Sequence, residues 1–390
     1  MPNNVLLCRS DGYLGKELGI FSLNGVLMAI NKQKLKDVKN LFFINRENYF
    51  IKNGPSSPVV VQIQVTNRCN LSCRHCYVSS GKANLEEMSD QEITKLLLDL
   101  RNWGVLKIQW VGGEVFTRKG FLNLAQYAKE LGFEQSLLTN GVFFGLKNKN
   151  ENIFRRCWDL FYTIQVSVDD FGDNFNQFVG RKNVWTIVCD AVDNLSQSKP
   201  KNKTLSIATI IRSDNILAIP KIVRLFDRKV DLVRLGKEIP TGRSLNTQKL
   251  TIEALFNSWK EVLVLRESGV SVRIGHPFDK NVLQKSALLP SDWKSDNGAR
   301  TFMYISSDGT AYPFPLLVNI KGFCGGSVLK DDLNNIWLSK AFKSYREIER
   351  KDTGCKNCKK ECQIWPRYHF IYNHSVNLRE KPFSHPGCDL

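Results

Sequence analysis

Three cysteines lie close together in the segment TNRCNLSCRHCY, residues 66–77, which follows the apolar run VVVQIQV. Cys69, Cys73 and Cys76 have C-x3-C-x2-C spacing. Three thiolates can hold three irons of a cubane iron-sulfur cluster and leave the fourth iron without a protein ligand. The amine and carboxylate of an amino acid can chelate that open iron. Zinc is the alternative, but a tetrahedral zinc site needs a fourth ligand, and His75 lies awkwardly between two of the cysteines.

A second group of cysteines near the end of the chain has C-x2-C-x3-C spacing and a distant fourth member: Cys355, Cys358, Cys362 and Cys388. These four predict one auxiliary iron-sulfur cluster, because thiolates are the usual ligands of such clusters. Cys324, in the segment GFCGG, could replace one of them. A zinc ribbon is the alternative, and the basic and aromatic residues of CKNCKKEC and WPRYHF would then suggest a nucleic-acid binder.

The composition bounds the class of protein. With 390 residues, 42% of them hydrophobic, the chain can hold one large domain and a smaller one. No run approaches the roughly 18 apolar residues of a membrane span. Grouped cysteines favour metal binding in a reducing compartment over disulfides, so we expect a cytoplasmic protein. The isolated cysteines are expected to be ordinary buried thiols: Cys8, Cys157, Cys189 and Cys324.

The charge balance is strongly basic. The chain has 55 Lys and Arg against 38 Asp and Glu, a net charge of +17. Such an excess favours an acidic partner, such as a peptide, a small redox protein or nucleic acid. A basic, solvated surface is the alternative interpretation.

The elements that position these residues follow from the apolar pattern. Residues 1–57 predict a small β-rich unit, with Asn24-Gly25 between two apolar runs as a hairpin signal. Residues 58–275 alternate strands and helices six times, which predicts an α/β fold, a partial (β/α)6 TIM-like barrel with a parallel sheet. Each polar motif lies at the carboxyl end of a strand, where such folds keep their active sites. In residues 276–390 the alternation is lost, and SSDGTAYPFP predicts a hairpin before a helix near 334–350 and the cysteine-rich tail.

The first cysteine loop resembles the signature of the radical S-adenosylmethionine (SAM) superfamily, C-x3-C-x-aromatic-C, with His75 in the aromatic position. The resemblance covers residue 59 to about residue 245. It implies a [4Fe-4S] cluster that binds SAM, and reductive cleavage of SAM to a 5'-deoxyadenosyl radical that abstracts a substrate hydrogen. The cofactor carries the difficult chemistry and the protein positions it.

The resemblance also assigns cofactor-binding residues. Gly112, Gly113 and Glu114 match the GGE motif, whose backbone and carboxylate take the methionine ammonium of SAM. The motifs at the ends of the third and fourth strands correspond to Asn140 in LLTNG and to Ser167 and Asp169 in VSVDD. For the last two, capping of a helix is the alternative.

Two positions depart from the family pattern. Relatives often have Pro after GGE, where this chain has Val115. They often carry an Arg for the SAM carboxylate just before the glycine that is Gly180 here, and Val179 stands in that place. Arg181 is the candidate to replace it, with a solvated surface cation as the alternative.

The C-terminal region resembles the SPASM or shorter twitch extension through the segments DGTAYPFPL and LNNIWLSKAFKSYRE. A full SPASM domain holds two auxiliary clusters, but the ligand positions of one of them fall near Asn297, at Phe314 and near Pro366, so one auxiliary cluster is expected. Four protein ligands would close that cluster and favour electron transfer or structure. If a substrate coordinates this cluster instead, one of the four cysteines cannot be a ligand, and Cys388, near the chain end, is the first candidate.

Extended enzymes of this kind mostly modify ribosomally made peptides, and the loop resembles those of peptide maturases, including thioether-forming maturases of sporulation killing factors. The resemblance implies a precursor peptide substrate and a flavodoxin or ferredoxin electron donor, with neither membrane nor nucleic acid as a partner. Residues 1–57 fit a remnant of a leader-peptide-binding domain, with a packing extension as the alternative. The bond formed and the catalytic residue stay open. The alternatives are a SPASM-type enzyme acting on a tetrapyrrole or other small molecule, and the zinc-ribbon nucleic-acid-binding protein.

Overall fold

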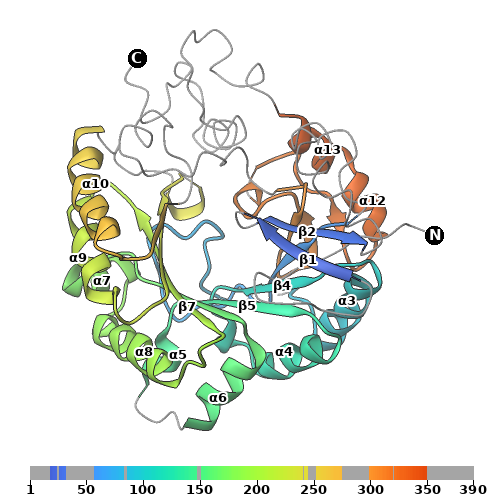
Figure 1. The fold of residues 1–390 in the computed structure, drawn as a ribbon. Helices are drawn as coiled ribbons and strands as arrows, with labels where there is room; N and C mark the ends of the chain where they lie inside the picture. Colours follow the sequence, from blue (N-terminus) through green and yellow to red (C-terminus); the bar gives the residue numbers. More distant parts are fainter. Residues whose placement is uncertain are drawn as a thin grey trace, which may run out of the picture.

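The structure, a computed structural model, describes most of the chain between residues 57 and 348 and two strands near the N-terminus (Figure 1). The described ranges are 18–23, 26–31, 57–82, 86–146, 151–239, 241–244, 252–274, 298–318 and 320–348. The predicted auxiliary-cluster ligands, Cys355, Cys358, Cys362 and Cys388, lie outside them.

A curved sheet of ten strands forms the centre of the molecule, in the order β12-β11-β10-β3-β4-β5-β6-β7-β8-β9. Its six middle strands run parallel and in chain order, as the sequence predicts. They are β3 (Val60–Gln64), β4 (Lys107–Val111), β5 (Glu134–Thr139), β6 (Thr163–Ser167), β7 (Thr204–Ile211) and β8 (Leu232–Lys237). Within the described chain β12 and β9 end the order, so the barrel is open and the predicted partial (β/α)6 architecture is confirmed.

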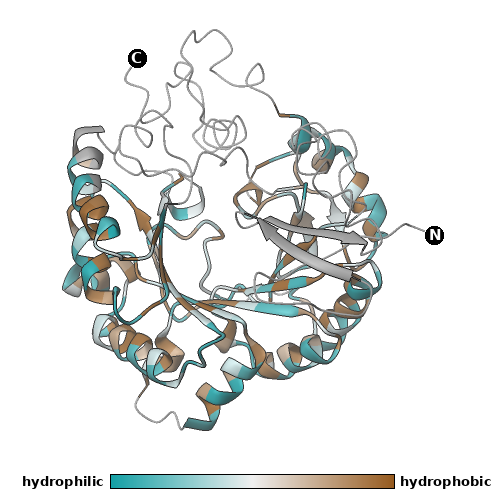
Figure 2. Ribbon diagram, in the orientation of Figure 1, coloured by the Kyte–Doolittle hydropathy of each residue, from teal (hydrophilic) through white to brown (hydrophobic). Residues whose placement is uncertain are grey.

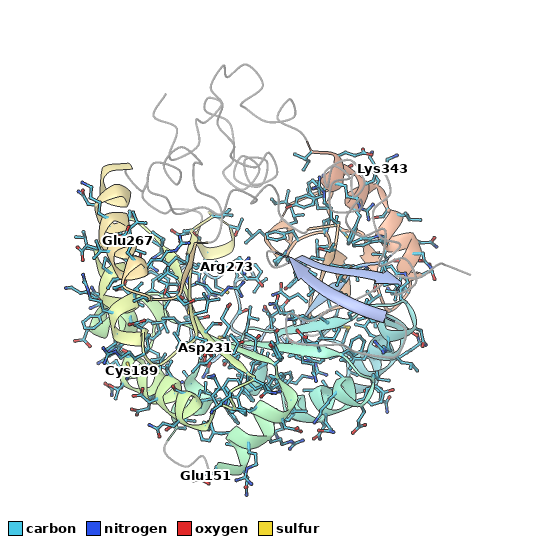
Figure 3. All side chains as sticks on the ribbon, in the orientation of Figure 1. Glu151, Cys189, Asp231, Glu267, Arg273 and Lys343 are labelled. Atoms are coloured by element: carbon cyan, nitrogen blue, oxygen red, sulfur yellow. The ribbon has the colours of Figure 1, made fainter. Side chains whose placement is uncertain are left out.

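Helices cover the outer, convex side of this sheet (Figure 1). The connecting helices are α3 (Asp90–Asn102), α4 (Phe121–Glu130), α5 (Val142–Gly145), α6 (Glu151–Leu160), α7 (Gly172–Val179), α8 (Val184–Ser198), α9 (Ile219–Phe226) and α10 (Ile252–Glu267). Figure 2 shows hydrophobic residues on their sheet-facing sides and hydrophilic ones outside. The core therefore lies between sheet and helices.

Helix α3 shows how the sequence sets these elements. Ser89 accepts a hydrogen bond from the Glu92 backbone N–H, and the Glu92 carboxylate accepts one in return from the Ser89 backbone N–H, a capping box. The apolar residues that follow at helical spacing are buried: Ile93, Leu96, Leu97 and Leu100. Both features are visible in the sequence.

The C-terminal extension continues the barrel sheet. Strands β10 (Phe302–Ile305) and β11 (Thr310–Tyr312) form the predicted antiparallel hairpin, and β11 pairs with β12 (Gly326–Ser327). Strand β10 also runs parallel to β3, a pairing that the sequence does not predict. At the other edge, β9 (Val272–Ile274) adds a strand beside β8.

Two helices occupy the region where one was expected. Helix α12 (Leu333–Leu338) ends at Ser339, and α13 (Lys340–Glu347) begins there, because the Ser339 hydroxyl accepts a hydrogen bond from the Phe342 backbone N–H. A serine that caps the second helix thus interrupts the first.

The N-terminal hairpin is confirmed. Strands β1 (Leu18–Leu23) and β2 (Val26–Asn31) are antiparallel, and Leu23 pairs with Val26 across the predicted Asn24-Gly25 turn. Among the helices that the structure describes, none has the length and apolar character needed to cross a membrane.

Candidate cluster and SAM site

The first cysteine loop leaves the carboxyl end of β3 and is held by its own backbone. Cys69 donates its N–H to the Gly81 carbonyl at 2.9 Å. Two of the thiol sulfurs accept backbone hydrogen bonds: Cys69 Sγ from Leu71 at 3.4 Å, and Cys76 Sγ from Ser80 at 3.2 Å. Hydrogen bonds to sulfur are among the features that tune iron-sulfur clusters.

The three thiols share one partly buried environment. Burial raises the pKa of the Cys69 thiol to about 11, and Glu114 and Cys76 add to the shift. Burial, Asp169 and the other two cysteines raise the pKa of Cys73 well above its usual range. Three neighbouring thiolates therefore need a strong positive charge among them, which bound iron supplies.

A single metal ion does not fit this loop as well as a cluster does. In the part of the chain that the structure describes, no three His, Cys, Asp or Glu side chains are grouped closely enough to share one ion. Three thiols from the loop match three irons of a cubane cluster, whereas a closed tetrahedral zinc site needs four ligands.

The GGE segment after β4 packs directly on the start of the cysteine loop. Gly113 donates its N–H to the Thr66 carbonyl at 2.7 Å, and Glu114 donates to the Arg68 carbonyl at 2.8 Å. A Cβ at Gly113 would lie 2.3 Å from the Arg68 carbonyl oxygen, and one at Gly112 would lie 3.2 Å from that of Thr66. Glycine is required at 113 because two backbone segments meet there.

The Glu114 carboxylate is buried, with 2% of the residue exposed. It accepts hydrogen bonds from the Thr139 hydroxyl at 2.9 Å and from the backbone N–H groups of Asn140 at 2.8 Å and Phe116 at 3.3 Å. Burial raises its pKa to about 7, against the opposing effect of these hydrogen bonds. An ammonium group beside it would favour the ionised form.

Asn140, at the end of β5, connects this carboxylate to the cysteine loop. Its side-chain amide donates to Asn70 Oδ1 at 2.7 Å and lies 3.9 Å from Cys69 Sγ. The structure therefore brings together three sequence-predicted motifs: the cysteine loop, GGE and Asn140.

The residues that follow β6 lie on the other side of the loop. Asp169, 3% exposed, accepts a hydrogen bond from the Ile210 backbone N–H at 2.8 Å, and its other oxygen lies 3.7 Å from His75 Nε2. Phe171 occupies the N-cap position of helix α7 and makes no side-chain capping bond, so Asp169 is not the capping residue. Ser167 is partly buried at the strand end, where its hydroxyl makes no hydrogen bond to the described residues.

His75 packs against α7. Its ring stacks on Phe178 with a centroid separation of 4.9 Å and an interplanar angle of 5°. Burial lowers the His75 pKa, although Asp169 opposes the shift, and Nδ1 is buried without a partner in the described chain. The Arg212 guanidinium lies 3.6 Å from the Phe178 ring centre and pairs with Asp170 at 3.0 Å. Sequence reasoning missed Phe178 and Arg212, which no motif marks.

The end of α7 also meets the loop. Ser72 donates its N–H to the Val179 carbonyl at 2.9 Å, and a Cβ at Gly180 would lie 3.1 Å from Ser72 Cβ. Arg181 follows and is exposed, with its backbone N–H bonded to the Asn176 carbonyl. It thus lies beside the loop without a side-chain ion pair to the described residues.

One contact to the loop was missed, and it comes from the short 3-10 helix η4 (Gly242–Ser244) after β8. Arg243 donates from Nε to the Cys73 carbonyl at 2.9 Å. The rule that places sites at the carboxyl ends of parallel strands could have marked it.

The isolated cysteines behave differently from one another. Cys157 is fully buried, as expected, and Cys189 is partly buried. Cys324 is exposed, so the expectation that it is a buried thiol was wrong; it lies in the loop leading into β12, at the sheet edge. Cys8 lies outside the described residues.

Two family models match the chain. One describes the radical SAM superfamily and matches residues 63–226; the other describes an iron-sulfur cluster-binding domain, SPASM, and matches residues 297–363.

Curated proteins of similar sequence include a maturation protein and a maturase. The sporulation killing factor maturation protein SkfB of Bacillus subtilis is 28% identical over 188 residues, 48% of this chain and 44% of that protein. The mycofactocin maturase MftC of Mycolicibacterium smegmatis is 24% identical over 313 residues, 79% of this chain and 77% of that protein. The match thus spans less than half of the first relative.

Solved structures show the same fold. Streptococcus suis SuiB bound to S-adenosylmethionine superposes with a TM-score of 0.66 over 96% of this chain and 84% of that one, at 15% identity. SuiB bound to its precursor peptide SuiA gives a TM-score of 0.65.

Proposed function

The chain belongs to the radical SAM superfamily, with a SPASM domain following its radical SAM domain, and we propose that it is a maturase that modifies a ribosomally synthesised precursor peptide. The observation that carries the proposal is the meeting of three cysteines, the GGE turn and Asn140 at the carboxyl ends of β3, β4 and β5. Three thiols and one protected carboxylate suit a cluster with an open iron and an amino-acid ligand.

In this proposal Cys69, Cys73 and Cys76 hold three irons of the [4Fe-4S] cluster. When bound, the cluster supplies the electron that cleaves SAM and so generates the radical that abstracts a substrate hydrogen. The chain itself binds and orients SAM and excludes water.

The amino-acid end of SAM is assigned to the GGE side of the site. Glu114 takes the ammonium through its ionised carboxylate, and Gly112 and Gly113 let the backbone approach it. Thr139 and Asn140 fix the orientation of that carboxylate through the hydrogen bonds they donate to it.

The ribose and carboxylate of SAM are assigned to the opposite side. Ser167 has a hydroxyl available, and Asp169 is oriented by the Ile210 backbone and lies near His75. Arg181 is the proposed partner of the SAM carboxylate, because it follows the glycine that packs on the loop. Its exposure, and the lack of an ion pair to the residues that the structure describes, leave it able to turn toward a ligand.

The substrate class is proposed from two facts. SkfB is named as a maturation protein and MftC as a maturase, and SuiB has been solved with a precursor peptide. The net charge of +17 favours an acidic peptide segment. We further assign a flavodoxin or ferredoxin as electron donor, residues 1–57 as a leader-binding remnant, and one auxiliary cluster to Cys355, Cys358, Cys362 and Cys388.

The test uses the full chain, reconstituted with iron and sulfide, and a precursor peptide encoded beside it. With SAM and a reductant we expect 5'-deoxyadenosine and a modified peptide. A loss of two hydrogens indicates a crosslink, an unchanged mass an epimerisation, and a large loss an excision. Deoxyadenosine that forms only with a tetrapyrrole or another small molecule would refute the peptide assignment.

A further inference from the structure

Arg243, in the short 3-10 helix η4 (Gly242–Ser244) that follows β8, contacts the cysteine loop through three hydrogen bonds. Its Nε donates to the Cys73 carbonyl at 2.9 Å and its Nη1 to the Ser80 carbonyl at 2.6 Å. Its backbone N–H donates to the Cys76 carbonyl at 3.1 Å. Arg243 thus binds the carbonyls of Cys73, Cys76 and Ser80, so it contacts the loop before, at and after Cys76.

The backbone around Arg243 is shaped for this contact. Gly242 has a positive φ of 58°, and a Cβ there would lie 2.4 Å from the carbonyl oxygens of both Cys76 and Tyr77. A side chain at this position would push the two segments apart. The close approach requires glycine and places the guanidinium next to the loop.

The positive charge of Arg243 lies beside the same cysteines. Its guanidinium donates to the backbone carbonyl of Cys73 and to that of Ser80, so the cation is held against the loop that carries the thiols. The guanidinium is solvent-exposed, so salt screens part of its charge. Its position is nevertheless fixed by the loop carbonyls.

We propose that Arg243 is a positioning residue for the radical SAM cluster: it clamps the loop from Cys73 to Ser80 and stabilises the reduced cluster by its positive charge. Reduction adds an electron, so a nearby cation favours the reduced form and raises the reduction potential. The inference rests on the cluster that the proposed function requires.

Two substitutions separate charge from clamping. Arg243→Gln removes the charge, and we expect at least a tenfold fall in the equilibrium constant for reduction, about 59 mV for one electron. The fall should be smaller at high ionic strength because the side chain is exposed. Arg243→Lys keeps the charge and loses the guanidinium fork. The equilibrium constant for reduction of its cluster should therefore stay within about twofold of the wild-type value.

The measurement is an EPR-monitored redox titration of the reconstituted full chain. Release of iron to a chelator is followed in parallel, and it should be faster in both variants, because both lose the paired hydrogen bonds to the loop. Arg228→Gln is the matched control. Arg228 is an exposed residue after α9, and its replacement should change neither the cluster potential nor the rate of iron release.

Each result has a defined meaning. A cluster potential in Arg243→Gln equal to that of wild type overturns the proposal, as does iron release at the wild-type rate in both variants. If Arg243→Gln does not load iron, a tenfold shift in Arg243→Lys would overturn it, because the charge is kept there. A wild-type chain that assembles no SAM-cleaving cluster would refute the proposed function instead.

Discussion

Replacing Glu114 by Gln should weaken the binding of SAM and remove its dependence on pH. The carboxylate is buried, accepts hydrogen bonds from Thr139 and Asn140, and has a pKa of about 7. It is therefore about half ionised at neutral pH in the free protein. A charge-assisted hydrogen bond to the SAM ammonium is worth about 1.5–3 kcal/mol, which corresponds to a roughly tenfold or larger loss of affinity in Glu114→Gln.

The pH dependence follows from the same pKa. Because SAM prefers ionised Glu114, wild-type affinity should rise by about tenfold between roughly pH 6 and pH 8, as the carboxyl group loses its proton. Because the pKa of Glu114 is higher in the folded than in the unfolded protein, the group stabilises the fold at low pH. This contribution is lost as the pH rises from the pKa of the unfolded state through about 7. Bound SAM should recover that loss.

The assay is equilibrium binding of SAM to the anaerobically reconstituted chain at several pH values, with cluster absorbance as a check on loading. Glu130→Gln is the control, since Glu130 is an exposed carboxylate at the end of α4. Equal SAM affinity in wild type and Glu114→Gln, with the cluster intact, would refute the assignment of this carboxylate to the ammonium.

Three further predictions concern the clusters and the loop. Replacing Cys69, Cys73 and Cys76 together by Ala should abolish release of 5'-deoxyadenosine under dithionite, and continued release would show that the loop does not hold the cluster. The same triple variant should retain about two to four irons with matching sulfide in the auxiliary site, and zinc alone in metal analysis would contradict it. Gly113→Ala places a Cβ 2.3 Å from a loop carbonyl and should lower both Tm and iron content; Gly81→Ala, where a Cβ meets nothing within 4 Å, is the control, and equal effects of the two would be evidence against the close packing.

The repeated features of the fold could be predicted from sequence because each is local. The capping box at Ser89 and Glu92, the hairpin across Asn24-Gly25 and the alternation from β3 to β8 all depend on residues close in the chain. Because active sites lie at the carboxyl ends of parallel strands, the sequence also predicts that the cysteine loop, GGE and Asn140 lie close together. The structure brings them together in this way.

The features of the fold and the site that could not be predicted depend on contacts between residues distant in the chain. Pairing of β10 with β3 joins residues more than 200 positions apart, and the Arg243 contact to Cys73 spans 170. Short α7 buries Phe175, Phe178 and Val179, but nothing local in the sequence indicates that Phe178 stacks on His75. No local pattern in this sequence reports that Glu114 turns toward Thr139.

The most direct test of the account is transfer of hydrogen from peptide to cofactor. The reconstituted chain, SAM and a reductant are incubated with the deuterated precursor peptide, and 5'-deoxyadenosine is analysed by mass spectrometry. The account predicts 5'-deoxyadenosine that carries a deuterium, together with a modified peptide. Unlabelled 5'-deoxyadenosine with an unaltered peptide, from an enzyme whose cluster and SAM binding are intact, would contradict it.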